Sequence, residues 1–444
     1  MVVHLSLNVT AVRFGKFIFL FLVAVCLGCQ EQREPAAAAD LPPTALTEES
    51  PTATESFRQE PAAGFTELLN QVESLRVVER QAVIDQYLAH LPDAPITSDE
   101  TALFIFRGDA STVQLVGDMN NWILESAPHL ERLVGTDLWY LESSFEEDAR
   151  LDYQFVINGD DWRLDPLNPR TMMGGFGPNS ELVMPGYQIP PELLPAVEKI
   201  TPGIIESHTL DSAYLGQTRT FFVYKPASQI VGAKLPSIYI NDGGDYLNLI
   251  ETAAILDRLI TDRVIPPLVA VFVPPISRDV EYVENDDYVR FLSDELVPFI
   301  QRVYETDPDP AKTGTMGASL GGSAALYTTL SRPDVFGLTA GQSGAYSLNN
   351  DAVIGKLKSA NRAHRSGRQL QHDLRLYFVV GVYETAISGN TTTGNLLMAN
   401  RRLLHALESS DYAYSYGERP EGHSWGLWRG TLGKALSYLY NPDE

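Results

Sequence analysis

The segment 315–322 constrains the fold of this chain more than any other, because it contains G-x-S-x-G with Ser319 at its centre. An extended polar stretch, 310–315, precedes it, and a run of small residues typical of a helix, 322–330, follows it. A strand, a tight glycine-flanked turn and a helix predict a nucleophile elbow, in which the serine hydroxyl projects above a sheet. The N-terminus of the following helix would favour a developing oxyanion, and the backbone N–H of Leu320 would donate to it.

Composition and charge limit the classes of protein to which this chain can belong. With 444 residues, 44% of them hydrophobic, 20 tyrosines and 18 phenylalanines, the chain can form two or three domains with substantial cores. Its formal net charge of −24 argues against nucleic acid or an anionic lipid surface as a partner. Histidines and carboxylates do not cluster at ligand spacings, so we expect neither a metal nor a cofactor.

The N-terminus has the features of an export signal. Two basic residues precede the apolar run 17–25, which is too short to predict a membrane-spanning helix. The run ends in CLGCQ, which holds both cysteines of the chain and resembles a bacterial lipoprotein signal. The resemblance implies that residues 1–28 are removed and that Cys29 is lipidated. It further implies an exported, lipid-anchored protein of the outer membrane or periplasm of a Gram-negative bacterium, whose only membrane contact is that anchor. An ordinary cleaved signal peptide is the alternative.

Two further segments separate the signal from the folded parts. Residues 29–60 are rich in Ala, Pro, Thr and Glu and have few large apolar side chains, which predicts a disordered tether. Apolar residues at helical spacing in 61–95 predict one or two amphipathic helices, which the prolines at 92 and 95 would close. We expect this helical segment to be a packing element rather than a site.

Short alternating strands separated by turn residues follow in 96–190, a pattern typical of a small all-β, immunoglobulin-like sandwich. The stretches LVGDMNNW, LDYQFVINGDDWRLDP and GPNSELVMPGY, within 98–188, resemble the glycogen- and starch-binding modules of carbohydrate-binding module family 48. The resemblance implies that Trp122 and Trp162 stack on sugar rings and that Asn179 hydrogen-bonds to them, with Gln154 where the family has lysine. Alternatively, these residues define the fold of a module that shapes a neighbouring active site.

The remaining segment, 205–444, alternates apolar strands with helical stretches such as 288–300. Strands are expected at 219–224, 237–240, 268–273 and 376–380. This alternation predicts an α/β domain of the hydrolase type, with a mostly parallel sheet covered by helices on both faces. An elbow serine at the edge of such a sheet is ready for nucleophilic chemistry.

A nucleophilic serine needs a base, and in α/β hydrolases the histidine comes last in the chain. Two histidines follow the last expected strand, namely His405 within a helical run and His423 in a glycine-flanked loop before a C-terminal helix. Because a loop histidine can reach across the carboxyl edge of the sheet, His423 is the predicted base.

The acid that orients this base is expected in the loop after the strand 376–380. Glu384 lies in that loop and is the predicted acid. Glu418 and Glu421 are close to His423 in the sequence and remain alternatives.

A second oxyanion donor is expected from the loop after an early strand. The loop 241–246 contains Gly243 and Gly244, which allow backbone N–H groups to face a substrate. A plain turn is the alternative.

Four motifs within 205–440 carry a second resemblance. In chain order they are NDGGDY, SRDVEYVENDDYVRFLSDELVPFI, GASLGGSAALYTTLSRPDVFG and EGHSWGLWR. Together they resemble the putative-esterase family, which includes enterochelin (ferric siderophore) esterases, feruloyl esterases and esterase D. The resemblance implies a serine carboxylic ester hydrolase with the triad Ser319, His423 and Glu384, and it places Arg278 and Trp425 in the substrate pocket.

Three hypotheses of function follow from these patterns. The motifs around Arg278 and His423 favour an enterochelin-esterase-like enzyme, although a net charge of −24 opposes an anionic ferric siderophore. The sugar-module resemblance favours a feruloyl or acetyl esterase that acts on plant polysaccharide. The third hypothesis is an inactive glycan-binding lipoprotein, which the presence of all three triad residues opposes. The expected partner is therefore a small-molecule or oligosaccharide ester.

Overall fold

The computed structural model describes residues 61–91, 93–196, 199–228, 232–366, 373–389 and 393–441. The expected signal, its lipidation site Cys29 and the tether 29–60 lie outside the described residues. Among the residues that are described, no helix combines the length and the apolar character needed to cross a membrane.

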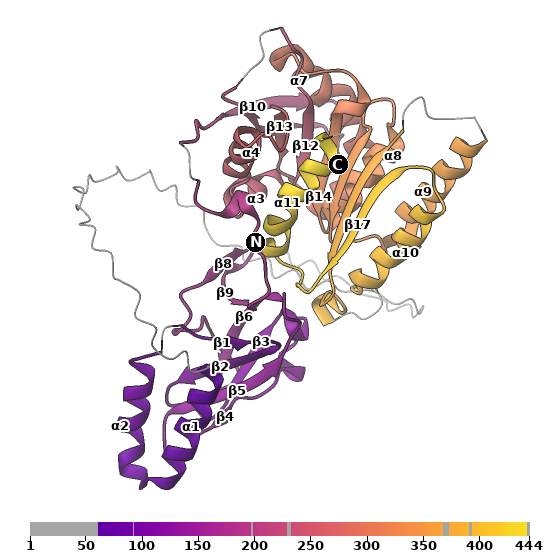
Figure 1. The fold of residues 1–444 in the computed structure, drawn as a ribbon. Helices are drawn as coiled ribbons and strands as arrows, with labels where there is room; N and C mark the ends of the chain where they lie inside the picture. The colour runs from indigo at the N-terminus through magenta and orange to yellow at the C-terminus, as the bar shows by residue number, and fades with distance from the viewer. Residues whose placement is uncertain are drawn as a thin grey trace, which may run out of the picture. The chain divides into compact units, whose positions relative to one another are not determined.

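An eight-stranded sheet forms the centre of the α/β domain, residues 204–441 (Figure 1). All strands except β11 run in one direction, since β11 is antiparallel to both of its neighbours. The expected mostly parallel sheet is therefore present. In spatial order the strands are β10 (Ile204–Ser212), β11 (Gln217–Lys225), β13 (Val269–Val273), β12 (Ser237–Asn241), β14 (Thr313–Ala318), β15 (Leu338–Gln342), β16 (Arg375–Gly381) and β17 (Ala413–Arg419).

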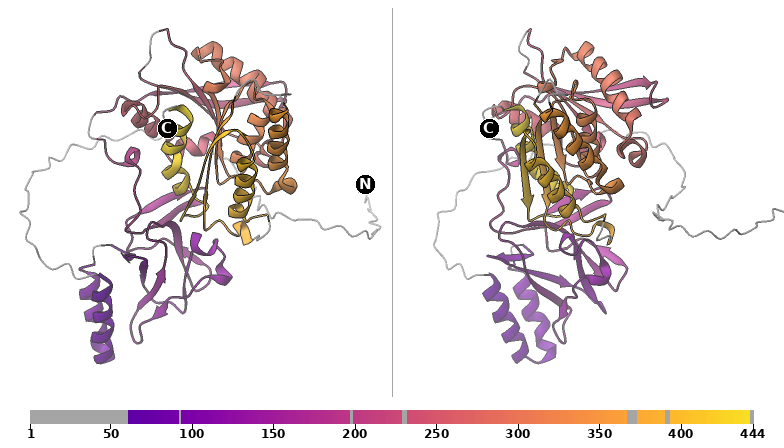
Figure 2. Two further views of the ribbon diagram at one scale, coloured as in Figure 1. Left: turned by 45° about the vertical axis from the view of Figure 1, so that its right-hand side comes forward. Right: turned by 90° about the vertical axis from the view of Figure 1, so that its right-hand side faces the viewer.

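Helices cover both faces of this sheet, which explains why its central strands are buried along their whole length (Figure 2). Side chains alternate along β12, so Ile238 and Ile240 pack with one set of helices and Tyr239 packs with the other. The first set is α3 (Gly243–Asn248), α4 (Thr252–Thr261) and α11 (Trp425–Tyr440). The second set is α5 (Arg278–Tyr282), α6 (Asp286–Arg290), a π-helical turn (Phe291–Leu296), α7 (Val297–Tyr304), α8 (Leu320–Ser331), α9 (Leu348–Arg365) and α10 (Leu396–Glu408).

Two antiparallel sheets precede this domain and form what we call the two-sheet region, residues 96–183. Phe104 and Phe106 of one sheet share a core with Leu151, Tyr153 and Phe155 of the other. The first sheet contains β1 (Ile96–Ser98), β2 (Thr101–Arg107), β5 (Leu138–Ser144) and β4 (Glu131–Arg132). The second contains β3 (Val113–Gly117), β6 (Arg150–Ile157), β9 (Gly177–Val183) and β8 (Thr171–Gly174), with β7 (Asp161–Arg163) paired to β6.

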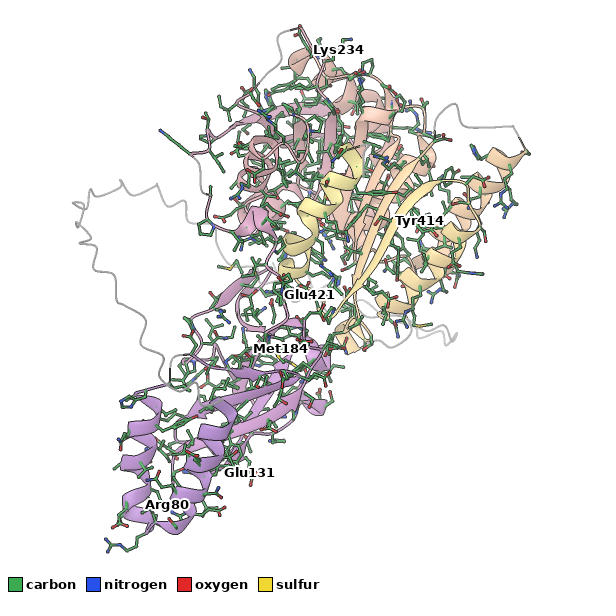
Figure 3. All side chains as sticks on the ribbon, viewed as in Figure 1. Arg80, Glu131, Met184, Lys234, Tyr414 and Glu421 are labelled. Carbon is green, nitrogen blue, oxygen red and sulfur yellow. The ribbon has the colours of Figure 1, made fainter. Side chains whose placement is uncertain are left out.

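Two helices, α1 (Pro61–Ser74) and α2 (Val77–Leu88), cover the outer face of the first sheet. Phe65 and Ile84 of these helices pack with Leu103 and Ile105 of β2, as expected for a packing element. The two-sheet region and the α/β domain belong to the same compact unit. Glu421, labelled in Figure 3, marks where they meet, because it forms a parallel β-bridge with Arg150 of β6.

Candidate active site

Ser319 lies on a sharp turn between β14 and α8. Its backbone has a positive φ of 55° and a ψ of −121°, a strained conformation for a residue with a side chain. The flanking glycines are needed because the strand and the helix approach closely. A Cβ on Gly317 would lie 2.5 Å from the backbone of Gly321, and a Cβ on Gly321 would lie 2.8 Å from Oδ2 of Asp242. The local sequence thus forces the serine hydroxyl out of the turn.

His423 lies beside this hydroxyl, in the loop between β17 and α11. Its Nε2 is 3.1 Å from Oγ of Ser319, which is positioned to donate to it. Its side chain is 19% exposed, and the ring packs edge-on against Trp428 with centroids 5.0 Å apart. His405, the other candidate, lies on α10 with its side chain 81% exposed, next to Glu408. Of the two histidines, only His423 meets Ser319.

Glu384 is fully buried and accepts a hydrogen bond from His423 Nδ1 at 2.7 Å through its Oε2. Its Oε1 accepts from the backbone N–H of Gly381 at 2.7 Å and from the hydroxyl of Ser343 at 2.6 Å. Trp428 Nε1 in turn donates to Oγ of Ser343 at 3.0 Å. The carboxylate is therefore fixed from both sides, with one oxygen left for the imidazole.

The two alternative acids have other partners. Glu418 accepts two hydrogen bonds from Arg401, at 2.7 and 2.8 Å. Glu421 is buried at the β-bridge to Arg150, and burial raises its pKa to about 8. The structure thus brings Glu384, and neither alternative, to His423.

Two helices begin directly after the neighbouring parallel strands β12 and β14, at the edge of the sheet where Ser319 lies. Leu320 begins α8 after β14, and Gly243 and Gly244 begin α3 after β12, the strand that pairs with β14. The first N–H groups of a helix have no intrahelical acceptor and are free to bind an anion. Gly243 cannot carry a side chain, since a Cβ there would lie 2.2 Å from the backbone of Val273. The two helix starts thus meet at the same edge of the sheet.

Ser319 and His423 open onto a cavity of about 1010 Å³. The five remaining side chains predicted to contact substrate or sugar all line this cavity: Arg278, Trp425, Trp122, Trp162 and Asn179. Three of these, Trp122, Trp162 and Asn179, come from the two-sheet region. The predicted sugar-binding residues and the serine thus share one space.

The cavity is rich in acid. Asp118, Glu125, Asp152 and Asp245 line it. Burial and the charge of Asp152 raise the pKa of Asp118 to about 7, and burial also raises the pKa values of Asp152 and Asp245.

The positive charge of Arg278 is not free to balance the negative charges of these acids. It donates to both carboxylate oxygens of Asp242, at 2.8 and 2.9 Å. Burial alone would lower the pKa of Arg278, but the bonds to Asp242 outweigh burial and raise it. The guanidinium therefore stays charged, and its charge is already paired.

The polar and aromatic side chains of the two-sheet region form an ordered wall. Trp122 Nε1 donates to Asp118 at 3.0 Å, while Trp162 is 44% exposed. Gln154 Nε2 donates to Oδ1 of Asn179 at 3.0 Å, and Asn179 Nδ2 donates to Asp152 at 3.2 Å. Gln154, which stands in place of the expected lysine, thus holds Asn179 without adding charge.

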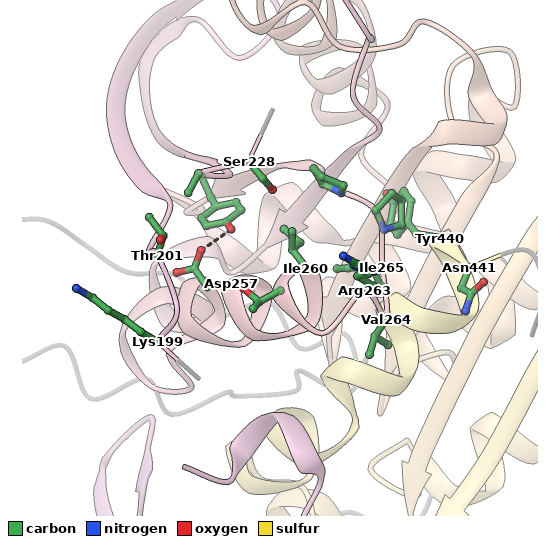
Figure 4. A pocket seen from close by; sticks show the side chains of 15 residues that line it. Lys199, Thr201, Ser228, Asp257, Ile260, Arg263, Val264, Ile265, Tyr440 and Asn441 are labelled. Carbon is green, nitrogen blue, oxygen red and sulfur yellow. Dashed lines mark hydrogen bonds between the residues drawn. The ribbon is translucent and has the colours of Figure 1, made fainter. Parts of the chain in front are cut away.

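A second cavity, of about 780 Å³, is lined by residues that include Lys199, Arg263 and Asp257 (Figure 4). Its clearest interaction is a 2.7 Å hydrogen bond from the Tyr224 hydroxyl to Asp257. None of Ser319, Glu384 and His423 lines it. Across the described parts of the chain, no three His, Cys, Asp or Glu side chains are grouped to hold a metal ion.

Three comparisons relate the chain to known proteins. An iron(III) enterobactin esterase of Escherichia coli is 26% identical over 357 residues, covering 70% of this chain and 82% of that protein. An endo-1,4-beta-xylanase/feruloyl esterase of Xylanibacter ruminicola is 28% identical over 153 residues, covering 31% of this chain and 21% of that protein. The crystal structure of an enterobactin esterase from Shigella flexneri, in the presence of enterobactin, superimposes with a TM-score of 0.65 at 22% identity, over 78% of this chain and 95% of that one.

The structural likeness supports the fold, and the match to a family model supports the class of activity. The model described as "Putative esterase" matches residues 212–439, more than half of the chain, and spans the turn at Ser319, Glu384 and His423. The chain therefore belongs to this esterase family and is a carboxylic ester hydrolase.

Proposed function

We propose that the protein is a serine esterase in which Ser319 is the nucleophile, His423 the general base and Glu384 the acid that orients it. The observation that carries this proposal is the hydrogen-bonded series Ser319–His423–Glu384, with distances of 3.1 and 2.7 Å, at the wall of a large cavity. Ester turnover by the chain with and without the Ser319 hydroxyl tests it.

In the proposed mechanism, Ser319 Oγ attacks the ester carbonyl while Nε2 of His423 takes its proton. The N–H groups of Leu320 and of the Gly243–Gly244 turn stabilise the oxyanion, as preorganised donors do without reorganising during the reaction. The protonated imidazole then gives its proton to the departing alcohol. Water, activated by His423 in the same way, releases the acyl group and restores Ser319. Glu384 stays ionised and stabilises the imidazolium throughout.

For the substrate, we propose an uncharged ester with an aromatic or sugar group. Trp122, Trp162 and Trp425 offer apolar faces on which such groups pack. Of the acids in the cavity, Asp152 is paired with Arg150 at 2.7 Å, whereas Glu125 and Asp245 form no ion pair with any described residue. Two like charges 4 Å apart repel by about 4 kcal/mol at an effective dielectric constant of 20, so an anionic substrate is disfavoured here. A feruloyl or acetyl ester of a polysaccharide meets these requirements.

An iron(III) siderophore ester is the second candidate. Similarity to an iron(III) enterobactin esterase over 70% of this chain favours it, because the similarity extends beyond the α/β domain. The charge of the cavity opposes it, since three catecholates around iron(III) carry a net negative charge. A comparison of kcat/KM for a neutral ester and for an iron(III) siderophore ester decides between the two candidates.

We expect the cavity to prefer a neutral ester over its anionic counterpart. The chain should hydrolyse 4-nitrophenyl hexanoate at least about ten times faster, in kcat/KM at low salt, than mono-4-nitrophenyl adipate, which has a terminal carboxylate; a factor of ten corresponds to about 1.4 kcal/mol. Asp245→Asn should narrow the ratio, because it removes one acidic charge from the cavity. Glu131→Gln, the same charge change on an exposed residue of β4, should leave the ratio unchanged. Two outcomes would contradict an uncharged ester as the substrate class. One is equal kcat/KM for the two esters, and the other is a higher kcat/KM for hydrolysis of an iron(III) tri-catecholate lactone than for the neutral ester.

We also propose that the protein is exported and lipid-anchored, on the basis of the apolar run 17–25 and the sequence CLGCQ. We expect the mature chain to begin at Cys29, with acyl groups attached to it. Mass spectrometry of the N-terminal peptide from the native host measures this. A mature chain that begins at another residue, without acyl groups, indicates the ordinary signal peptide instead.

A further inference from the structure

The two-sheet region contacts both loops that carry the partners of Ser319. One loop follows β16 and holds Glu384, and the other follows β17 and holds His423. Building on the proposed triad, we propose that the two-sheet region is a positioning part of the catalytic site. Asn121 fixes the loop of Glu384, and Arg150 fixes the loop of His423. The region would then be needed for the chemical step, even with substrates too small to touch its tryptophans.

Asn121 makes three hydrogen bonds to the two residues that follow Glu384. Its Oδ1 accepts from the backbone N–H groups of Thr385 and Ala386, at 3.1 and 2.9 Å. Its Nδ2 donates to the hydroxyl of Thr385 at 3.0 Å. On the other side of Glu384, the hydroxyl of Tyr383 donates to Glu146 at 2.5 Å. The chain is thus held by the two-sheet region immediately before and after the acid.

The backbone at Asn121 is strained in a way that suits this role. Asn121 has φ 53° and ψ 30°, and Trp122 next to it has φ 60°, so two successive residues with side chains are left-handed. Such conformations are unfavourable for residues with side chains and persist where surrounding contacts determine them. Asparagine tolerates this conformation better than most residues. In this conformation the Asn121 amide bonds to the loop of Glu384 rather than to its own turn.

Contacts to the base loop are equally direct. Arg150 is buried, donates through Nη1 to Oγ of Ser424 at 3.1 Å, and donates through its backbone N–H to the carbonyl of Pro420 at 3.2 Å. Gly422 packs against Asp118 so closely that a Cβ there would lie 2.1 Å from Cγ of the aspartate. The residues on both sides of His423 therefore rest on the two-sheet region.

Ser319 itself is positioned differently. Its backbone N–H donates to the carbonyl of Gln342 in β15 at 2.9 Å, so the sheet of the α/β domain sets the nucleophile. Loosening the contacts at Asn121 should therefore leave Ser319 in place while Glu384 and His423 lose their alignment. A loss of this kind appears in kcat, whereas the loss of a cavity wall appears in KM.

The chain offers a matched control for Asn121. Asn158 is also left-handed, with φ 54°, and its Oδ1 accepts from Ser111 N–H, Ser111 Oγ and Thr112 N–H, at 2.7, 2.7 and 3.3 Å. All of these partners lie within the two-sheet region. Asn158→Ala should therefore lower stability in the same way as Asn121→Ala, without reaching the loop of Glu384.

The test compares these variants of the full chain on 4-nitrophenyl acetate. We expect Asn121→Ala to lower kcat by about 10- to 100-fold, as misplacement of a catalytic group does, with KM within about twofold. The acid limb of the pH profile of kcat/KM should move to lower pH, because a misaligned Glu384 stabilises the imidazolium less. Asn121→Asp keeps the acceptor for both N–H groups and should recover part of kcat. Asn158→Ala should keep the wild-type kcat and pH profile.

Some outcomes would contradict this positioning proposal and leave the proposed triad unaffected. If Asn121→Ala and Asn158→Ala lower Tm equally and both keep the wild-type kcat, or if Asn121→Ala changes only KM, then Asn121 does not position the acid. If Asn121→Ala does not fold, Thr385→Val removes one of the three bonds from the other side, and an unchanged kcat and pH profile there would count against the proposal. Ester turnover that does not need the Ser319 hydroxyl would instead refute the proposed function.

Discussion

Alanine in place of Ser319 is expected to lower kcat for 4-nitrophenyl acetate by about 10⁶-fold, the scale at which loss of the nucleophile acts in serine hydrolases. The variant lacks the Oγ that lies 3.1 Å from Nε2 of His423, so no acyl-enzyme can form. The helix start at Leu320 and the Gly243–Gly244 turn remain, and residual turnover would come from the binding groups alone. Initial rates of 4-nitrophenol release, corrected for spontaneous hydrolysis, measure the effect.

Ser323 provides the control for this substitution. It lies on α8 one turn after Ser319, is buried, and its Oγ has no hydrogen-bond partner among the described residues. Ser323→Ala should therefore fold and keep wild-type activity. Equal turnover by wild type and Ser319→Ala would show that the hydrolysis does not use this serine.

Glutamine in place of Glu384 is expected to lower kcat by about 10³- to 10⁴-fold, although the two side chains have nearly the same shape. The amide oxygen can still accept from Gly381 and Ser343, which leaves the NH₂ group facing His423. An NH₂ group cannot accept a hydrogen bond from Nδ1–H. The imidazole of His423 therefore adopts the tautomer that carries its proton on Nε2, the nitrogen that faces Ser319. In that tautomer His423 cannot take the proton of the serine.

The pH profile separates this effect from a loss of folding. Without the carboxylate the imidazolium is less stable, so the acid limb of kcat/KM should move to lower pH in Glu384→Gln. Glu418→Gln is the matched control, because Glu418 also lies near the base in sequence but is bonded to Arg401. Loss of activity in Glu418→Gln, together with normal activity in Glu384→Gln, would show that the acid has been misassigned.

The central features of the fold could be predicted because their causes are local. The glycines around Ser319 predict a tight turn, and continuous apolar runs such as 268–273 predict strands that are buried on both faces. The sequence patterns do not predict the strands β10, β15 and β17. β10 and β17 are the two edge strands and leave many side chains partly exposed, and β15 has the short, partly polar sequence LTAGQ, so none of the three shows a long apolar run.

The parts of the site that could not be predicted depend on contacts between distant segments. Ser343 supports Glu384 from 41 residues away, and Asn121 reaches Thr385 across 264 residues. The family resemblance places Arg278 in the substrate pocket, but its pairing with Asp242 becomes visible only when two loops meet at one edge of the sheet. Local patterns led to the proposed reacting groups, whereas the contacts that hold those groups depend on tertiary structure.

The order of these segments along the chain has a consequence for biosynthesis. The two-sheet region is made early, but the loops that it contacts, 383–386 and 420–424, are made near the end of translation. Contacts between such distant segments form slowly, because a long loop must close before they can stabilise anything. A ribosome that stops before His423 releases a chain that contains the turn at Ser319 but lacks the proposed base. If His423 is the base, as proposed, chains that end before it cannot hydrolyse esters.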